Sequence, residues 1–271
     1  MSPYQRSPSG IAFDRSGPAD RWPVVLIHAG VADRRMWEPV WHHLTSTRDS
    51  VRLDLRGFGD SNVAPVGPLS HVTDVIEVLD HLGLAHCHLV GSSLGAGVVT
   101  EVALTRPRVA RSLVLCPPGG SLLAELTPDL QHFFEIEKSA LARHDIAAAV
   151  EANVSAWVVG HGRSESEVDP AVLAAVRTMQ RNVFEVAASW KNVSEIELDP
   201  PALDRLPELA TPTLVLTGGH DLATTHDSAR RVCAGAQHAS WVDWDDVAHL
   251  PSMEEPGRFL ALLLDWVTSH D

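Results

Sequence analysis

The chain of 271 residues has few cysteines, and none of them lies in a pairing motif. Cys87, Cys116 and Cys233 are widely separated and include no Cys-x-x-Cys pair. An odd, scattered set of thiols supports neither a disulfide framework nor a thiolate zinc site. We therefore expect these cysteines to be small buried side chains.

The sequence also lacks long apolar runs and an excess of basic residues. Apolar runs such as 259–264 are far too short to cross a bilayer, and residues 1–10 hold no apolar stretch like that of a secretory signal. The 35 acidic and 21 basic residues give a formal net charge of −14, which repels nucleic acid phosphates and anionic lipids. We expect a cytoplasmic protein with a small-molecule substrate and no nucleic-acid or membrane partner. Whether it forms a homodimer stays open.

Metal-binding motifs are missing although the chain has 15 histidines. The His42-His43 and His86-x-His88 pairs have no carboxylate at ligand spacing beside them, and no His-Glu-x-x-His occurs. The sequence predicts no metal and no other cofactor.

What is present is a regular alternation of short strand patterns and longer helical patterns. The strand patterns lie at 24–28, 51–55, 88–90, 112–115, 213–217 and 239–242. The helical patterns lie at 37–44, 72–82, 94–105, 228–234 and 256–269. This alternation predicts an α/β fold with a doubly wound, mostly parallel sheet.

One long gap, from 115 to 213, interrupts the alternation. It is rich in Ala, Leu, Val and Glu with helical periodicity. We predict a core of residues 1–119 and 207–271, with a helical cap inserted at 120–206.

A nucleophile motif lies between a predicted strand and a predicted helix. Gly91, Ser93 and Gly95 form Gly-x-Ser-x-Gly, in which a strained turn exposes the serine and the glycines leave room where strand and helix nearly touch. The start of the helix also points free N–H groups at the reaction centre. Ser92 falls one position off the pattern, so Ser93 is the predicted nucleophile.

A serine nucleophile needs a base and an acid later in the chain, in the order Ser, acid, His. Asp221 follows one predicted strand and His249 follows the next, where active sites of open α/β sheets lie. Asp221 and His249 are therefore the predicted partners of Ser93, and His220 is the histidine that competes most directly for the role of base.

Three further motifs make the chain resemble the α/β-hydrolase superfamily in its capped, enol-lactonase-like or esterase-like branch. They are Leu-Ile-His-Ala-Gly at 26–30, Asp-Leu-Arg-Gly-Phe-Gly-Asp-Ser at 54–61, and Ala-His-Leu-Pro at 248–251 followed by Met-Glu-Glu-Pro. The resemblance implies that the N–H groups of Gly30 and Leu94 form the oxyanion hole, with Val31 as the alternative to Gly30. Ala29 stands where the family usually has glycine, which leaves this register open. The 54–61 loop is assigned a scaffolding role.

These assignments predict hydrolysis of a small, largely apolar ester or lactone through an acyl-enzyme. Serine at position 93 disfavours the dehalogenases and epoxide hydrolases of this fold, which use aspartate. Substrate-binding candidates are Val31, Trp37, Phe134 and Trp157, for which core packing is the alternative. Three other functions stay open: hydrolysis of a C–C bond, non-hydrolytic cyclisation in secondary metabolism, and ligand reception with negligible turnover.

Overall fold

The protein is described by a computed structural model that covers residues 4–123, 125–190, 193–196 and 198–271. One sheet has the strand order β1-β2-β4-β3-β5-β6-β7-β8. Its strands are β1 (Gln5–Arg6), β2 (Ala12–Ser16), β3 (Val24–Ile27), β4 (Ser50–Leu53), β5 (Cys87–Ser93), β6 (Ala110–Pro118), β7 (Thr213–Gly218) and β8 (Ala239–Trp244). The β1–β2 and β2–β4 pairs are antiparallel and the others are parallel. The predicted doubly wound, mostly parallel sheet is confirmed.

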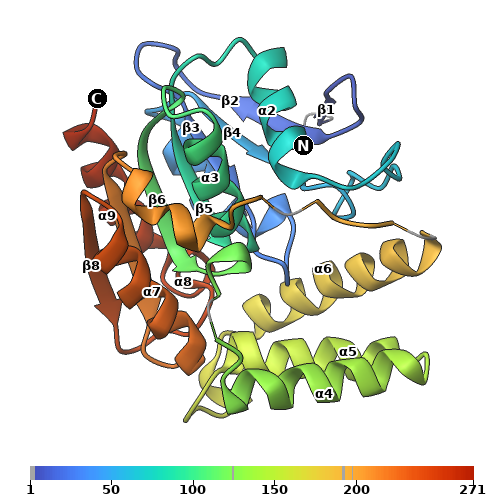
Figure 1. Ribbon diagram of the computed structural model, residues 1–271. Coiled ribbons are helices and arrows are strands. Elements are labelled where there is room, and N and C mark those ends of the chain that lie inside the picture. The colour runs from blue at the N-terminus through green and yellow to red at the C-terminus, as the bar shows by residue number, and fades with distance from the viewer. Residues whose placement is uncertain (1–3, 124, 191–192, 197) are drawn as a thin grey trace.

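Helices cover both faces of the sheet (Figure 1). They are α1 (Glu38–Thr45), α2 (His71–His81), α3 (Leu94–Thr105), α7 (Ala223–Gly235), α8 (Pro251–Glu254) and α9 (Pro256–Ser269). Because successive strand residues point to opposite faces, Leu26 packs in the cluster that holds α1 and α9. Ile27 packs in the cluster that holds α2, α3 and α7. Each apolar strand thus contributes to two cores, which explains why the strands read as continuous apolar runs.

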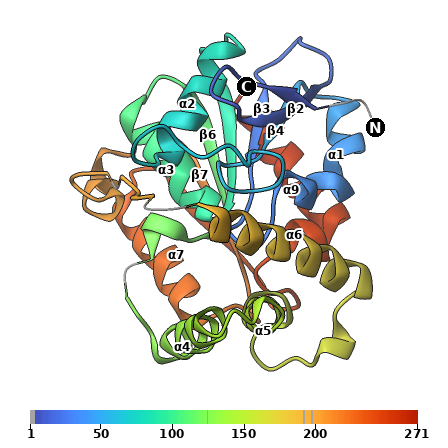
Figure 2. The ribbon, with the colours of Figure 1, turned by 90° about the vertical axis from the view of Figure 1, so that its right-hand side faces the viewer.

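The long gap in the alternation is helical, as expected. It contains α4 (Pro128–Ala142), α5 (Ile146–Asn153), a π-helical segment (Val154–Val159) and α6 (Pro170–Ser189). Asp145 and Asp169 accept N–H groups at the starts of α5 and α6 and so cap these helices. Figures 1 and 2 show α4, α5 and α6 together beyond one end of the sheet, with α6 nearer to it. The predicted bounds of the cap, 120–206, enclose these helices.

The structure differs from the sequence prediction in two places. The antiparallel β1 and β2 were not predicted, because Ala12–Ser16 is short, mixes apolar with charged residues, and obtains its partners from β4. Helix α7 begins at Ala223, not at 228. Its first turn contains Thr224 and Thr225, which are poor helix formers in isolation but are fully buried here. Within the described residues, no helix is long and apolar enough to span a membrane.

Candidate active site

The Gly-x-Ser-x-Gly motif forms a tight turn from β5 into α3. Ser93 ends β5 and precedes α3, with φ 54° and ψ −113°, a conformation that is rare for any residue except glycine. A Cβ atom on Gly91 would clash with the backbone of Gly95, and one on Gly95 would clash with the carbonyls of Ile27 and His28. Gly91 is therefore required by the tight turn between β5 and α3, and Gly95 by the close approach of α3 to the end of β3.

The two adjacent serines have different surroundings. Ser93 is partly exposed, whereas Ser92 is fully buried and its hydroxyl has no hydrogen-bond partner among the described residues. Gly119, which follows β6, lies over the nucleophile, because a Cβ atom there would sit 3.0 Å from Ser93 Oγ. No motif in the sequence marks Gly119 as a residue of the site.

The predicted acid and base are paired. His249 Nδ1 lies 2.7 Å from Asp221 Oδ2, and both side chains are buried. A carboxylate only accepts hydrogen bonds, so in the neutral ring Nδ1 carries the proton and Nε2 has a free lone pair. His220 takes no part in this pair, because its Nδ1 lies 2.8 Å from the carbonyl oxygen of His161 in an exposed position.

The loop after β3 is held by a buried histidine. The Leu55 N–H donates to His28 Nε2 at 2.9 Å, so His28 Nδ1 carries the proton and donates to the Ala29 carbonyl at 2.8 Å. Burial lowers the pKa of His28 to about 4, which keeps the ring neutral. The Ala32 N–H donates to the same Ala29 carbonyl at 3.0 Å. Two donors thus fix the direction of this carbonyl.

This arrangement also directs the N–H group of Gly30. The peptide unit between Ala29 and Gly30 is planar, and in the trans form its N–H points away from its carbonyl. Gly30 is next to Leu94, since a Cβ atom on Gly30 would lie 3.6 Å from Leu94 Cβ. Within the described parts of the chain, the N–H groups of Gly30, Val31 and Leu94 have no protein acceptor.

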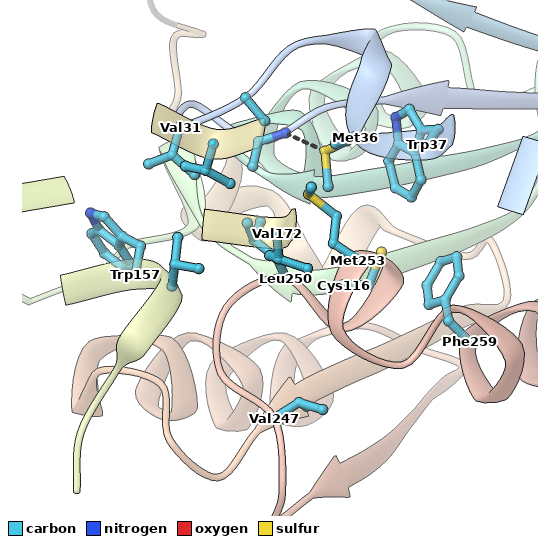
Figure 3. Close-up of a cluster of buried hydrophobic side chains, with 14 of the residues drawn as sticks. Val31, Met36, Trp37, Cys116, Trp157, Val172, Val247, Leu250, Met253 and Phe259 are labelled. Atoms are coloured by element: carbon cyan, nitrogen blue, oxygen red, sulfur yellow. Dashed lines mark hydrogen bonds between the residues drawn. The ribbon is translucent and has the colours of Figure 1, made fainter. Parts of the chain in front are cut away.

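A sulfur atom completes the support of this loop. The Ala29 N–H donates to Met36 Sδ at 3.3 Å (Figure 3), and both residues are fully buried. The motif at 26–30 does not reveal this contact, because Met36 lies in the 3-10 turn that follows the loop. Both polar groups of the Ala29 backbone are therefore satisfied.

The 54–61 loop packs against the loop that follows β3. Asp54 is fully buried, forms an ion pair with Arg34 and accepts the N–H groups of Arg34 and Asp60, each at 2.8 Å. Burial raises the pKa of Asp54 to about 6, and Arg34 opposes this shift. Together with the Leu55 contact to His28, these bonds tie the 54–61 loop to the loop after β3.

The structure places three of the four substrate-binding candidates, Val31, Trp37 and Trp157, in one apolar cluster. Val31 and Trp157 belong to one apolar cluster with Val172 from the cap and Leu250 from the loop after β8 (Figure 3). The Trp157 ring lies against His249, with ring centroids 4.4 Å apart.

Trp37 belongs to the same cluster, whereas Phe134 lies outside it. Trp37 has no exposed surface and packs against Phe259, with ring centroids 5.9 Å apart. Phe134 is 43% exposed on α4, and Phe133 packs against both it and Trp157. Substrate contact by any of the four residues remains a prediction.

A cavity of about 460 Å³ borders the turn at Leu94 and Gly120. Its walls combine apolar side chains such as Val98 and Leu123 with the polar side chains of His71, Glu101, Ser121 and Glu195. This size suits a small molecule. No group of three or more His, Cys, Asp or Glu side chains that could hold a metal ion is found in the described ranges.

The fold, the turn at Ser93 and the His249–Asp221 pair define the class of protein. The family model for the alpha/beta hydrolase fold matches residues 23–256, and the chain belongs to that family. The resemblance seen in the sequence is confirmed.

Particular relatives are distant but match almost the whole chain. The 3-oxoadipate enol-lactonase 1 of Acinetobacter baylyi is 21% identical over 94% of this chain and 91% of its own. The solved enol-lactonase from Burkholderia xenovorans has a TM-score of 0.79 at 21% identity and covers 98% of this chain and 100% of its own. Est816, described as an N-acyl homoserine lactone degrading enzyme, has a TM-score of 0.75 at 24% identity, with 97% and 99% covered. The similarity to the solved structures shows a shared fold.

Proposed function

We propose that this α/β-hydrolase cleaves a small, largely apolar ester or lactone through an acyl-enzyme on Ser93. The observation that carries the proposal is the buried 2.7 Å contact between His249 Nδ1 and Asp221. It leaves His249 Nε2 free to accept a proton, at the same edge of the sheet as Ser93, since β5, β7 and β8 run in parallel.

The mechanism follows from these groups. His249 Nε2 takes the proton of Ser93 Oγ as the oxygen attacks the substrate carbonyl, and Asp221 stabilises the imidazolium. The tetrahedral intermediate collapses, the imidazolium gives its proton to the leaving alcohol oxygen, and the acyl group stays on Ser93. Water, activated by His249 in the same way, then releases the acid and restores the serine.

The oxyanion is assigned to the N–H groups of Gly30 and Leu94. Two donors hold the Ala29 carbonyl and so direct the Gly30 N–H to the opposite side, and Gly30 lies beside Leu94. This favours Gly30 over Val31 as the donor. Preorganised backbone donors of this kind lower the barrier by several kcal/mol, about 3 each.

The substrate class rests on the apolar surroundings and on the relatives. Val31, Trp157 and Leu250 offer no hydrogen-bonding side chain except the indole N–H, so an uncharged acyl group suits them. The names of the relatives include an enol-lactonase and a lactone-degrading enzyme, which supports lactones alongside simple esters.

Turnover assays with a matched variant test the proposal. We expect multiple-turnover hydrolysis of short p-nitrophenyl esters or small lactones, and loss of this activity in Ser93→Ala with the fold retained by circular dichroism. Ser92→Ala is the control and should retain activity, because Ser92 is buried beneath the turn. Full activity in Ser93→Ala would refute the mechanism.

A further inference from the structure

The backbone of the loop that carries His249 is held at three consecutive N–H groups. Ala248 N and Leu250 N donate to Glu254 Oε1 at 3.0 and 3.4 Å, and His249 N donates to the Trp157 carbonyl at 3.2 Å. Glu254 lies in α8 of the core, whereas Trp157 lies in the π-helical segment inserted with the cap. The place of His249 therefore depends on both parts of the chain.

Arg163 connects these two supports. Its guanidinium donates to the carbonyls of Val158 and Val159 at 2.8 and 2.9 Å, at the end of the π-helical segment. It also forms an ion pair with Glu254 Oε2 at 2.7 Å. The side chains of Arg163 and Glu254 are only 8% and 7% exposed, so water competes little for these bonds.

The segment that Arg163 holds also contacts the ring of His249. Trp157 precedes the two carbonyls that Arg163 binds, and its ring lies 4.4 Å from that of His249. Gly160 fits closely against this region, because a Cβ atom there would clash with the His220 carbonyl. A displacement of residues 157–163 would thus remove a backbone partner, a ring contact and the cation beside Glu254 together.

We propose that Arg163 is a positioning residue that couples the cap to the base, because it fixes Glu254 and the Trp157 segment on either side of His249. The inference rests on the proposed role of His249 as the base. Arg163 is buried beside the base loop and touches none of the reacting groups. Its loss leaves Glu254 as a buried, unpaired acid and frees the Trp157 segment, so His249 loses its exact orientation toward Ser93.

The test compares Arg163→Met, which keeps most of the side-chain volume, with Arg163→Lys, which keeps the charge. We expect kcat in Arg163→Met to fall by about 10- to 100-fold with KM nearly unchanged, because misplacement of a catalytic group by about 1 Å costs that much. Labelling of Ser93 by a fluorophosphonate should slow in parallel. Arg163→Lys should recover part of both rates, and Glu254→Gln should lose them.

Arg258→Met is the matched control. Arg258 forms an exposed ion pair with Asp246, near the same loop, with the two side chains 45% and 62% exposed. Its loss should change kcat by less than about twofold. Equal effects of Arg163→Met and Arg258→Met, or an effect of Arg163→Met on KM alone, would overturn the proposal.

A spectroscopic readout separates this proposal from the proposed function. The His249 Nδ1–H donated to Asp221 should give a low-field proton resonance in the wild type, and it should broaden or shift in Arg163→Met but not in Arg258→Met. An unchanged resonance in Arg163→Met would refute the coupling even if the enzyme were inactive on esters. Activity that survives Ser93→Ala would refute the hydrolytic mechanism. The role of Arg163 would then be tested by this resonance alone.

Discussion

At the scale of single residues, the site depends on a strained serine and on glycines that permit the strain. Ser93 has φ 54°, and such a backbone costs about 1–3 kcal/mol, which the surrounding structure must offset. Gly95 allows this, because only a hydrogen fits between the turn and the carbonyls of Ile27 and His28. The sequence motif is thus a packing requirement as well as a chemical one.

Gly95→Ala should therefore destabilise the protein and inactivate it. The added methyl meets backbone atoms that cannot rotate away, so we expect the free energy of unfolding to fall by about 1–3 kcal/mol or more. Urea denaturation measures the change. Gly257→Ala, at a position in α9 where a Cβ atom meets no atom within 4 Å, is the control and should be neutral. Equal stability of the two variants would contradict this account of the turn.

At the scale of elements, those with strong local patterns are predictable from the sequence and those defined by distant contacts are not. The predicted bounds of α3 and α9, 94–105 and 256–269, agree with the structure, because a glycine motif or a Glu-Pro pair marks where each begins. The π-helical Val154–Val159 has no such mark. Arg163, which follows the segment, donates to its Val158 and Val159 carbonyls. The His249 N–H, in a loop nearly a hundred residues further along the chain, donates to its Trp157 carbonyl.

The same distinction holds within the candidate site. Ser93 ends a strand, Asp221 and His249 each follow one, and all three carry recognisable chemistry, so they could be selected as candidates from the sequence. The support of the loop after β3 could not, because a methionine sulfur rarely acts as a structural acceptor and only the fold brings Met36 against Ala29.

Met36→Leu tests that support. It keeps the side-chain volume but leaves the buried Ala29 N–H without an acceptor, so the free energy of unfolding should fall by about 1 kcal/mol and kcat should decrease as the loop relaxes. Met179→Leu, the same change at a buried position in α6, controls for packing. If both variants behave alike in urea denaturation and in ester hydrolysis, the sulfur contact has no role.

At the scale of the whole molecule, buried histidines make stability depend on pH. Burial lowers the pKa values of His28, His71 and His88 to about 4 in the folded protein, whereas an unfolded histidine has a pKa of about 6.5. Between these values the unfolded chain binds protons that the folded chain does not, so folding weakens as the pH falls. Asp54, with its pKa raised to about 6, acts in the opposite direction, as do Glu137 and Glu254, whose pKa values burial also raises. Against the effect of burial, hydrogen bonds and nearby cations lower the pKa values of carboxyls such as Asp33 and Asp271, and these groups act in the same direction as the histidines.

We therefore expect the free energy of unfolding to decrease on acidification below about pH 6.5, by up to about 1.4 kcal/mol per pH unit for each buried histidine. Urea denaturation at about pH 7 and about pH 5 measures this. His71→Gln, which removes one of the three groups, should reduce the decrease. A free energy of unfolding that is constant or rises over this range would contradict the burial of neutral histidines.

The central claim, that Ser93 is the nucleophile of a hydrolase, is tested most directly by mass spectrometry of the acyl-enzyme. The protein is mixed with a slowly hydrolysed p-nitrophenyl ester, quenched in acid and digested. We predict one acyl group per chain, located on Ser93, that disappears on continued incubation and does not form in His249→Ala at a comparable rate. An acyl group located on another residue, or none despite turnover of the ester, would contradict the claim.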